Sequence, residues 1–137
     1  MQGVARNFFT MAVIYSIVGM MLGLSMAMSH DHSQLPTHAH IMVLGWVMSA
    51  VFAFFYHLVP AARASRLASI HFWLAAISSI GMVVGLFVLY GGNPSIEPLL
   101  AVSALAYFAA TLLFAFIALS ALWRSEGAGA TGRVATN

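Results

Sequence analysis

The sequence predicts an all-helical membrane protein whose chain crosses the bilayer four times. Three observations lead to this fold class: 62% of the 137 residues are hydrophobic, only 6% are charged, and the apolar residues gather into four long runs without charge. A water-soluble domain carries roughly a quarter charged residues, so a soluble globule is excluded. A disordered chain is excluded as well, because hydrophobicity is high and the net charge is only +2.

The four apolar runs define the expected spans. Each supplies the ~20 apolar residues that a helix needs to cross a bilayer, and the spans are predicted at about 8–28, 38–60, 67–90 and 98–123. The first run is longer than the ~7–15 apolar residues of a cleaved signal peptide, so we expect a retained helix. Residues 1–124 therefore form one transmembrane domain in which neighbouring helices are antiparallel. The Gly- and Ala-rich residues 125–137 are predicted to be a flexible tail.

All five basic residues are arginines, and the predicted topology places them on one side of the membrane. Arg6 precedes the first span, Arg63 and Arg66 join the second and third, and Arg124 and Arg133 follow the fourth. The positive-inside rule then places the N and C termini in the cytoplasm. Five basic residues without a clustered stripe are too few for a nucleic-acid-binding face.

Several classes of site have no residues here. The absence of cysteine excludes disulfides, thiolate-bound iron–sulfur clusters and thiolate zinc sites. No carboxylate lies inside a predicted span, and neither a Gly-rich phosphate loop nor a Ser/His/Asp set is present. The pairs Gly19–Gly23 and Gly81–Gly85 are small-residue stripes, which are typical of close helix packing. We therefore predict no catalytic residue from the sequence.

The informative residues are six histidines, which depth divides into an outer group of four and an inner group of two. In chain order they are His30, His32, His38, His40, His57 and His71. Ionisable residues at membrane depth are costly and indicate a function. Imidazole is also the usual ligand of haem iron, copper and zinc in proteins.

His38 and His40 lie two residues apart, which corresponds to ~200° of rotation on an α-helix. They therefore project from nearly opposite faces and are suited to two different sites, one on each flank of the helix. The alternative is that both are interfacial residues hydrated by lipid headgroups. His57 lies ~25 Å from His40 along the same helix, so these two cannot share one metal ion within a chain.

The remaining histidines form weaker candidates. His30 and His32 in the outer loop, with two methionines nearby, are candidate ligands of copper or zinc; the alternative is a solvated turn. His57 and His71 are expected near the inner surface, where they face each other as a second candidate site or cap the ends of helices.

The second and third spans resemble two consecutive helices of a known family. Residues 37–46 read Thr-His-Ala-His-Ile-Met-Val-Leu-Gly-Trp, and residues 56–60 read Tyr-His-Leu-Val-Pro. This pattern resembles the ligand-bearing tenth helix of the catalytic subunit of cbb3-type cytochrome c oxidases, in the haem-copper oxidase superfamily. Residues 71–75, His-Phe-Trp-Leu-Ala, resemble the start of the helix that follows. The resemblance covers residues 37–85, whereas the first and fourth spans match only in hydropathy.

The resemblance implies that the chain binds haem b. It implies that His38 ligates a high-spin haem and His40 a low-spin haem, with Trp46 of the same motif as a further cofactor-binding candidate. It assigns His71 a structural or tuning role and places His57 at a variable position, so these two are secondary candidates. The family's copper ligands and tyrosine come from helices that this chain lacks, so oxygen reduction by this chain alone is not expected.

We therefore expect a cytochrome-b-like protein of the bacterial inner membrane, acting in electron transfer, haem handling or gas sensing, with a respiratory-chain protein as a candidate partner. One alternative is a copper- or zinc-binding or transport module built on the outer histidines. Another is an accessory or assembly subunit of a respiratory complex. The twelve helices of the family's catalytic subunit form three similar arcs of four, so the resemblance also implies that three copies of this chain close into a ring. Each haem then lies at an interface, between His40 of one chain and His38 of the next.

Overall fold

The computed structural model describes the backbone of residues 1–134 and the side chains of residues 1–123. All regular elements in this range are helical, and four helical segments are long and apolar enough to cross a membrane, as the sequence predicts. In chain order the elements are α1 (Val4–Ser29), α2 (Leu35–His40), the π-helix η1 (Ile41–Val47), α3 (Met48–Leu58), α4 (Pro60–Arg63), α5 (Arg66–Tyr90), the short 3₁₀ helix η2 (Pro94–Ile96) and α6 (Glu97–Val134). The predicted flexible tail, 125–137, falls on the last part of α6 and on residues 135–137, which lie outside the described residues; its mobility stays a prediction.

Local sequence explains where the helices begin and end. Pro36 lies in the first turn of α2, where its missing N–H costs nothing. Val59 leaves the helical conformation, with φ −118° and ψ 80°, because the following Pro60 disfavours a helical residue before it. At the start of α5, the side chain of Ser65 accepts a hydrogen bond from a backbone N–H in the first turn. Gly92, with φ 96°, supplies the left-handed residue that reverses the chain before α6.

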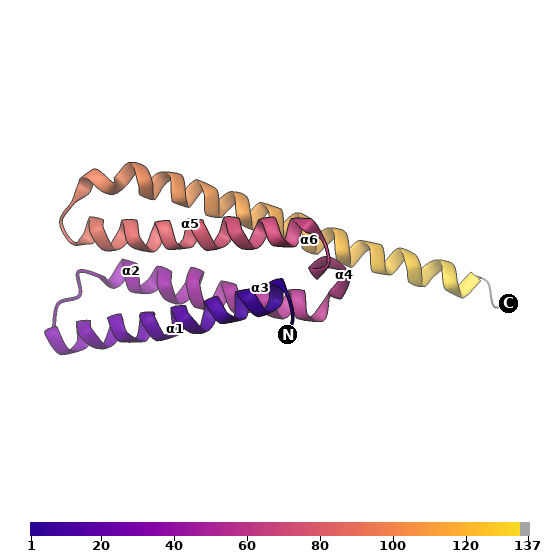
Figure 1. The fold of residues 1–137 in the computed structure, drawn as a ribbon, viewed down its shortest axis with the longest axis horizontal. Coiled ribbons are helices and arrows are strands. Elements are labelled where there is room, and N and C mark those ends of the chain that lie inside the picture. Colours follow the sequence, from indigo (N-terminus) through magenta and orange to yellow (C-terminus); the bar gives the residue numbers. More distant parts are fainter. Residues whose placement is uncertain (135–137) are drawn as a thin grey trace.

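The four long segments form two antiparallel hairpins, as Figure 1 shows. In the first, α1 packs along α2, η1 and α3, which together form one continuous rod, residues 35–58; in the second, α5 packs along α6. The N-terminus, α4 and the C-terminal part of α6 lie at one end, which we call the termini end. The connections between α1 and α2 and between α5 and η2 lie at the opposite end, the turn end.

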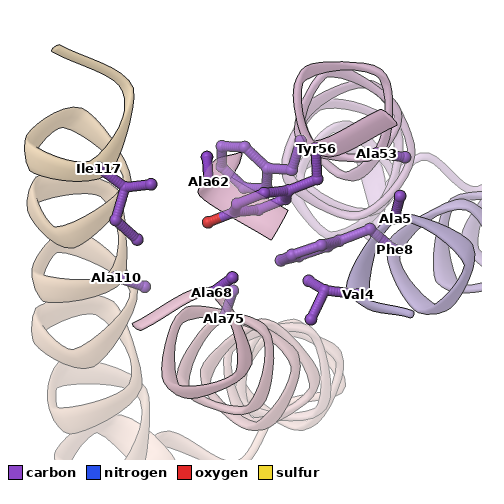
Figure 2. Packing of buried hydrophobic residues seen from close by; sticks show 11 residues of the cluster. Val4, Ala5, Phe8, Ala53, Tyr56, Ala62, Ala68, Ala75, Ala110 and Ile117 are labelled. Atoms are coloured by element: carbon purple, nitrogen blue, oxygen red, sulfur yellow. The ribbon is translucent and has the colours of Figure 1, made fainter. Parts of the chain in front are cut away.

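The main core is built from residues of both hairpins that lie toward the termini end of their helices, and Figure 2 shows how these residues pack. The rings of Phe8 and Tyr56 stack with centroids 5.9 Å apart and planes inclined by 10°. Phe52 meets the Phe8 ring edge-on at 5.3 Å. Small residues such as Ala68 and Ala75 of α5 let the helices approach these rings. Because lipid is as apolar as a leucine side chain, such close van der Waals packing, rather than escape from water, holds the helices together.

The glycine pairs lie at helix contacts, as predicted. A Cβ atom on Gly81 would come within 2.5 Å of the Ser103 hydroxyl oxygen, and one on Gly85 within 3.3 Å of Leu100 Cβ. Both contacts join α5 to α6. The pair Gly19–Gly23 lies on α1 against α2 and η1 and has a more specific neighbour, described below.

The π-helix is the one local feature that the sequence does not predict, since an uninterrupted helix is expected over 38–60. Two tyrosines from other helices contact it. Gly45 lies so close to the Tyr15 ring of α1 that a Cβ atom would collide with it. The carbonyl oxygen of Leu44 accepts a hydrogen bond of 3.2 Å from the hydroxyl of Tyr107 on α6. Single π-helical turns often mark functional sites, and this one directly follows His40.

Candidate functional site

His38 lies on α2 at the turn end and is held by α1. Its Nδ1 atom lies 2.9 Å from the backbone carbonyl oxygen of Gly19. A carbonyl oxygen can only accept a hydrogen bond, so Nδ1 carries a proton, and in the neutral imidazole Nε2 then carries the free lone pair. The imidazole ring also lies against Gly23, one turn further along α1, where a Cβ atom would come within 2.9 Å of His38 Cε1.

His40 has the same tautomer but a different support. Its Nδ1 atom lies 2.8 Å from the carbonyl oxygen of Pro36, one turn earlier in its own helix. This carbonyl again accepts the Nδ1 proton, so the Nε2 lone pair of His40 is free. Both imidazoles are half-buried. Within the side chains that the structure describes, no hydrogen bond reaches Nε2 of either histidine.

The hydrogen bonds of His38 and His40 are of the kind that a metal-ligating histidine requires. Such a histidine donates one ring N–H to a carbonyl or carboxylate, which fixes the tautomer and raises the basicity of the other nitrogen. His38 and His40 both meet this condition. They are not paired with each other, because one is held by α1 and the other by its own helix. Among residues 1–123, no three histidine or acidic side chains gather in a way that would hold a metal ion.

The histidines of the loop between α1 and α2 are exposed and lie apart from those on α2. His30 ends α1 in the left-handed conformation, with φ 57°, and the His32 ring contacts its carbonyl oxygen at 3.3 Å. Between them, hydrogen bonds from the backbone and hydroxyl of Ser33 hold the pKa of the Asp31 carboxyl below its ordinary value. The loop is thus an ordered polar turn, and the structure does not gather its histidines into a copper or zinc site within one chain.

His57 and His71 do not face each other. His57 is exposed on α3, whereas His71 of α5 is fully buried, with no exposed surface. The partner of His71 is the preceding residue of α3: the hydroxyl of Tyr56 lies 3.0 Å from His71 Nδ1. The expected pair of inner histidines is therefore a tyrosine–histidine pair. Trp46, the other cofactor-binding candidate, is 40% exposed on η1.

The tautomer of His71 follows from its surroundings. Its ring lies among those of Phe8, Phe52 and Phe114, with centroids at 5.0, 4.7 and 5.4 Å, and its Nε2 has no hydrogen-bond partner. If Tyr56 donates to Nδ1, only the Nε2 proton remains unpaired, and the aromatic rings accept it weakly. The opposite assignment leaves both a lone pair and a hydroxyl proton unpaired, which is costlier. His71 is therefore protonated on Nε2 and has no basic nitrogen free for a metal.

Replacing Tyr56 with phenylalanine is expected to destabilise the protein by roughly 1–3 kcal/mol, because it leaves the buried Nδ1 of His71 without a partner. Thermal unfolding in detergent micelles, followed by circular dichroism, measures the change. The matched control is Tyr90→Phe at an exposed position at the end of α5, where we expect little effect. Equal unfolding midpoints for the two variants would contradict the assigned role of the Tyr56 hydroxyl.

Some of the residues that shape the site are not recognisable as such in the sequence. The carbonyl groups of Gly19 and Pro36 hold the two histidines, and backbone acceptors leave no trace in residue type. Gly23 does leave a signal, since it belongs to a small-residue stripe, but the stripe indicates close packing without saying that the neighbour is an imidazole. The pairing of Tyr56 with His71 depends on how α3 is rotated against α5.

Comparison with known proteins supplies no relative from which residue roles can be transferred. No protein-family model, no curated protein and no solved structure matches this chain. The resemblance of residues 37–85 to helices of the cbb3-type oxidases stays a prediction.

Proposed function

We propose that this chain is a b-type haem-binding membrane protein in which His38 and His40 supply the axial ligands through Nε2. The observation that carries the proposal is that both Nδ1 protons are donated to backbone carbonyls, at 2.9 and 2.8 Å, which leaves two basic Nε2 atoms. A bound haem supplies one-electron chemistry and, where a coordination position opens, binding of small gas molecules. This supports a role in electron transfer, haem handling or gas sensing.

The donor set of the chain also favours haem over a bare metal ion. A tetrahedral zinc or copper site uses three or four protein ligands from one locality, and no three candidate ligands gather in residues 1–123. Haem iron already has four nitrogen ligands from its macrocycle, so it would need only two imidazoles from the protein, which His38 and His40 would supply. The chain has no cysteine for covalent attachment, which is why haem b is the type proposed.

The placement of charge supports an orientation in the bacterial inner membrane. Arg6, Arg63 and Arg66 lie at the termini end, whereas Asp31 and Glu97 lie at the turn end. The positive-inside rule then puts the termini end in the cytoplasm. The α2 histidines lie near the outer surface in this orientation, which suits exchange of electrons with a respiratory partner on that side.

Optical spectroscopy of the protein purified with added haem tests the proposal. We expect a Soret band and, on reduction, a sharp α band that is typical of six-coordinate low-spin iron. If each haem uses one His38 and one His40, we expect about one haem per chain. Metal analysis of the same sample provides the comparison. Stoichiometric copper or zinc without iron would replace the proposal with a metal-binding module. A haem-free protein that copurifies with a respiratory complex would replace it with an assembly subunit.

A further inference from the structure

We propose that Gly19 and Gly23 of α1 form a positioning seat for His38, which sets the direction in which its Nε2 points. This inference rests on the proposed function, because it assigns His38 the role of an iron ligand. The His38 seat consists of the Gly19 carbonyl oxygen and the open space beside Gly23. The two glycines act through His38 and have no contact with iron themselves, so they are positioning residues.

The two parts of the seat fix different degrees of freedom of the imidazole. The hydrogen bond of 2.9 Å to the Gly19 oxygen fixes one corner of the ring, at Nδ1. The surface of α1 beside Gly23 limits how the ring can turn about that corner. A Cβ atom at Gly23 would lie 2.9 Å from Cε1, 3.3 Å from Nδ1 and 3.6 Å from Nε2 of His38. The ring thus occupies the space beside Gly23 that the side chain of any other amino acid would fill.

The helix that carries the seat cannot easily move away to relieve a clash. A Cβ atom on Gly19 would meet the sulfur of Met42 at 2.5 Å and a methyl carbon of Ile41 at 2.9 Å, so α1 and η1 are in close contact, and moving α1 away would lose the van der Waals packing that holds these helices together. Gly45 of η1 contacts the Tyr15 ring of α1 in the same tight manner. A methyl group added at Gly23 is therefore accommodated by displacement of the flexible imidazole, and the bond to the Gly19 oxygen is lost.

Loss of that bond changes the ligand without removing it. The hydrogen bond selects the Nδ1–H tautomer and increases the basicity of Nε2. Removing an outer partner of this kind typically lowers metal affinity by 10- to 100-fold. A merely structural role for Gly23 predicts a change in unfolding temperature but no change in the tautomer of one histidine.

The test compares Gly23→Ala with Gly85→Ala, which adds the same methyl group at the contact between α5 and α6, where the nearest atoms lie at 3.3 and 3.4 Å. Haem titration is expected to give about 10- to 100-fold weaker binding for Gly23→Ala and wild-type binding for Gly85→Ala. Circular dichroism checks that both variants retain their helices. Wild-type haem affinity in a folded Gly23→Ala protein would contradict the positioning role of the two glycines and leave the proposed function in place.

A second measurement uses the haem-free protein and separates the two proposals. Nitrogen-15 NMR of labelled histidine reports the tautomer of each imidazole; the His38 signal is assigned by its loss in His38→Gln. We expect the Nδ1–H tautomer for His38 in the wild type and in Gly85→Ala, and its loss in Gly23→Ala. An Nε2–H tautomer in the wild type overturns the seat even if Gly23→Ala does not fold. If the wild type shows the Nδ1–H tautomer yet binds no haem, the seat is supported and the proposed function fails.

Discussion

Replacing His38 or His40 with alanine is expected to abolish the low-spin haem spectrum or convert it to a five-coordinate, high-spin one. Within the membrane, water does not replace an imidazole ligand with equal strength. We expect the affinity for haem to fall by more than the ~100-fold that loss of an outer hydrogen bond costs. Titration of each variant with haem, read at the Soret and α bands, measures the effect.

Histidines of the same chain serve as matched controls for this experiment. His57→Ala changes an exposed residue on the same rod as His38 and His40, and His32→Ala changes an exposed residue of the loop between α1 and α2. Both variants are expected to keep the wild-type spectrum. If His57→Ala removed the haem while His38→Ala and His40→Ala retained it, the cofactor would lie at the termini end and the ligand assignment would be wrong.

The architecture follows from the sequence because each span depends on local properties. Four apolar runs, separated by short polar linkers, suffice to predict four helical segments and their antiparallel order. Proline and glycine fix several boundaries in the same local way, as at Pro36 and Gly92. The π-helix differs because it depends on contacts from other helices: the Tyr15 ring against Gly45 and the Tyr107 hydroxyl on the Leu44 carbonyl. An apolar sequence pattern does not distinguish a π-helical turn from an α-helical one.

The candidate site also has some features that follow from local sequence and others that depend on contacts between helices. The spacing of His38 and His40 predicts that they serve different flanks, and the structure gives them different hydrogen-bond acceptors. Which atom accepts each proton depends on backbone positions that residue type does not encode. His71 shows the reverse case, since its depth alone suggests a ligand, whereas the Tyr56 hydroxyl and the surrounding rings leave it no free basic nitrogen.

The opposed directions of His38 and His40 raise the question of how one iron obtains two imidazoles. Residues two apart on an α-helix differ by ~200° in direction, so a haem that reaches Nε2 of one lies on the far side of α2 from the other. We propose that each haem is held between two copies of the chain, by His38 of one copy and His40 of the next. Head-to-tail contacts of this kind generate a closed ring when the rotation between copies closes, and a ring of three copies is the prediction made from the sequence.

Co-production of the His38→Ala and His40→Ala chains in equal amounts is therefore expected to restore the low-spin haem spectrum that neither variant has alone. An interface is intact when the His40→Ala chain supplies His38 and its neighbour, the His38→Ala chain, supplies His40. Random mixing leaves about a quarter of the interfaces in a closed ring with both histidines, so we expect about a quarter of the wild-type low-spin haem. A matched mixture of wild type with the doubly substituted chain also gives about a quarter if sites are shared, but about half if each chain holds its own haem. Native mass spectrometry of the same mixtures counts the chains per ring, and a monomer that retains haem on dilution would rule out ligation across an interface.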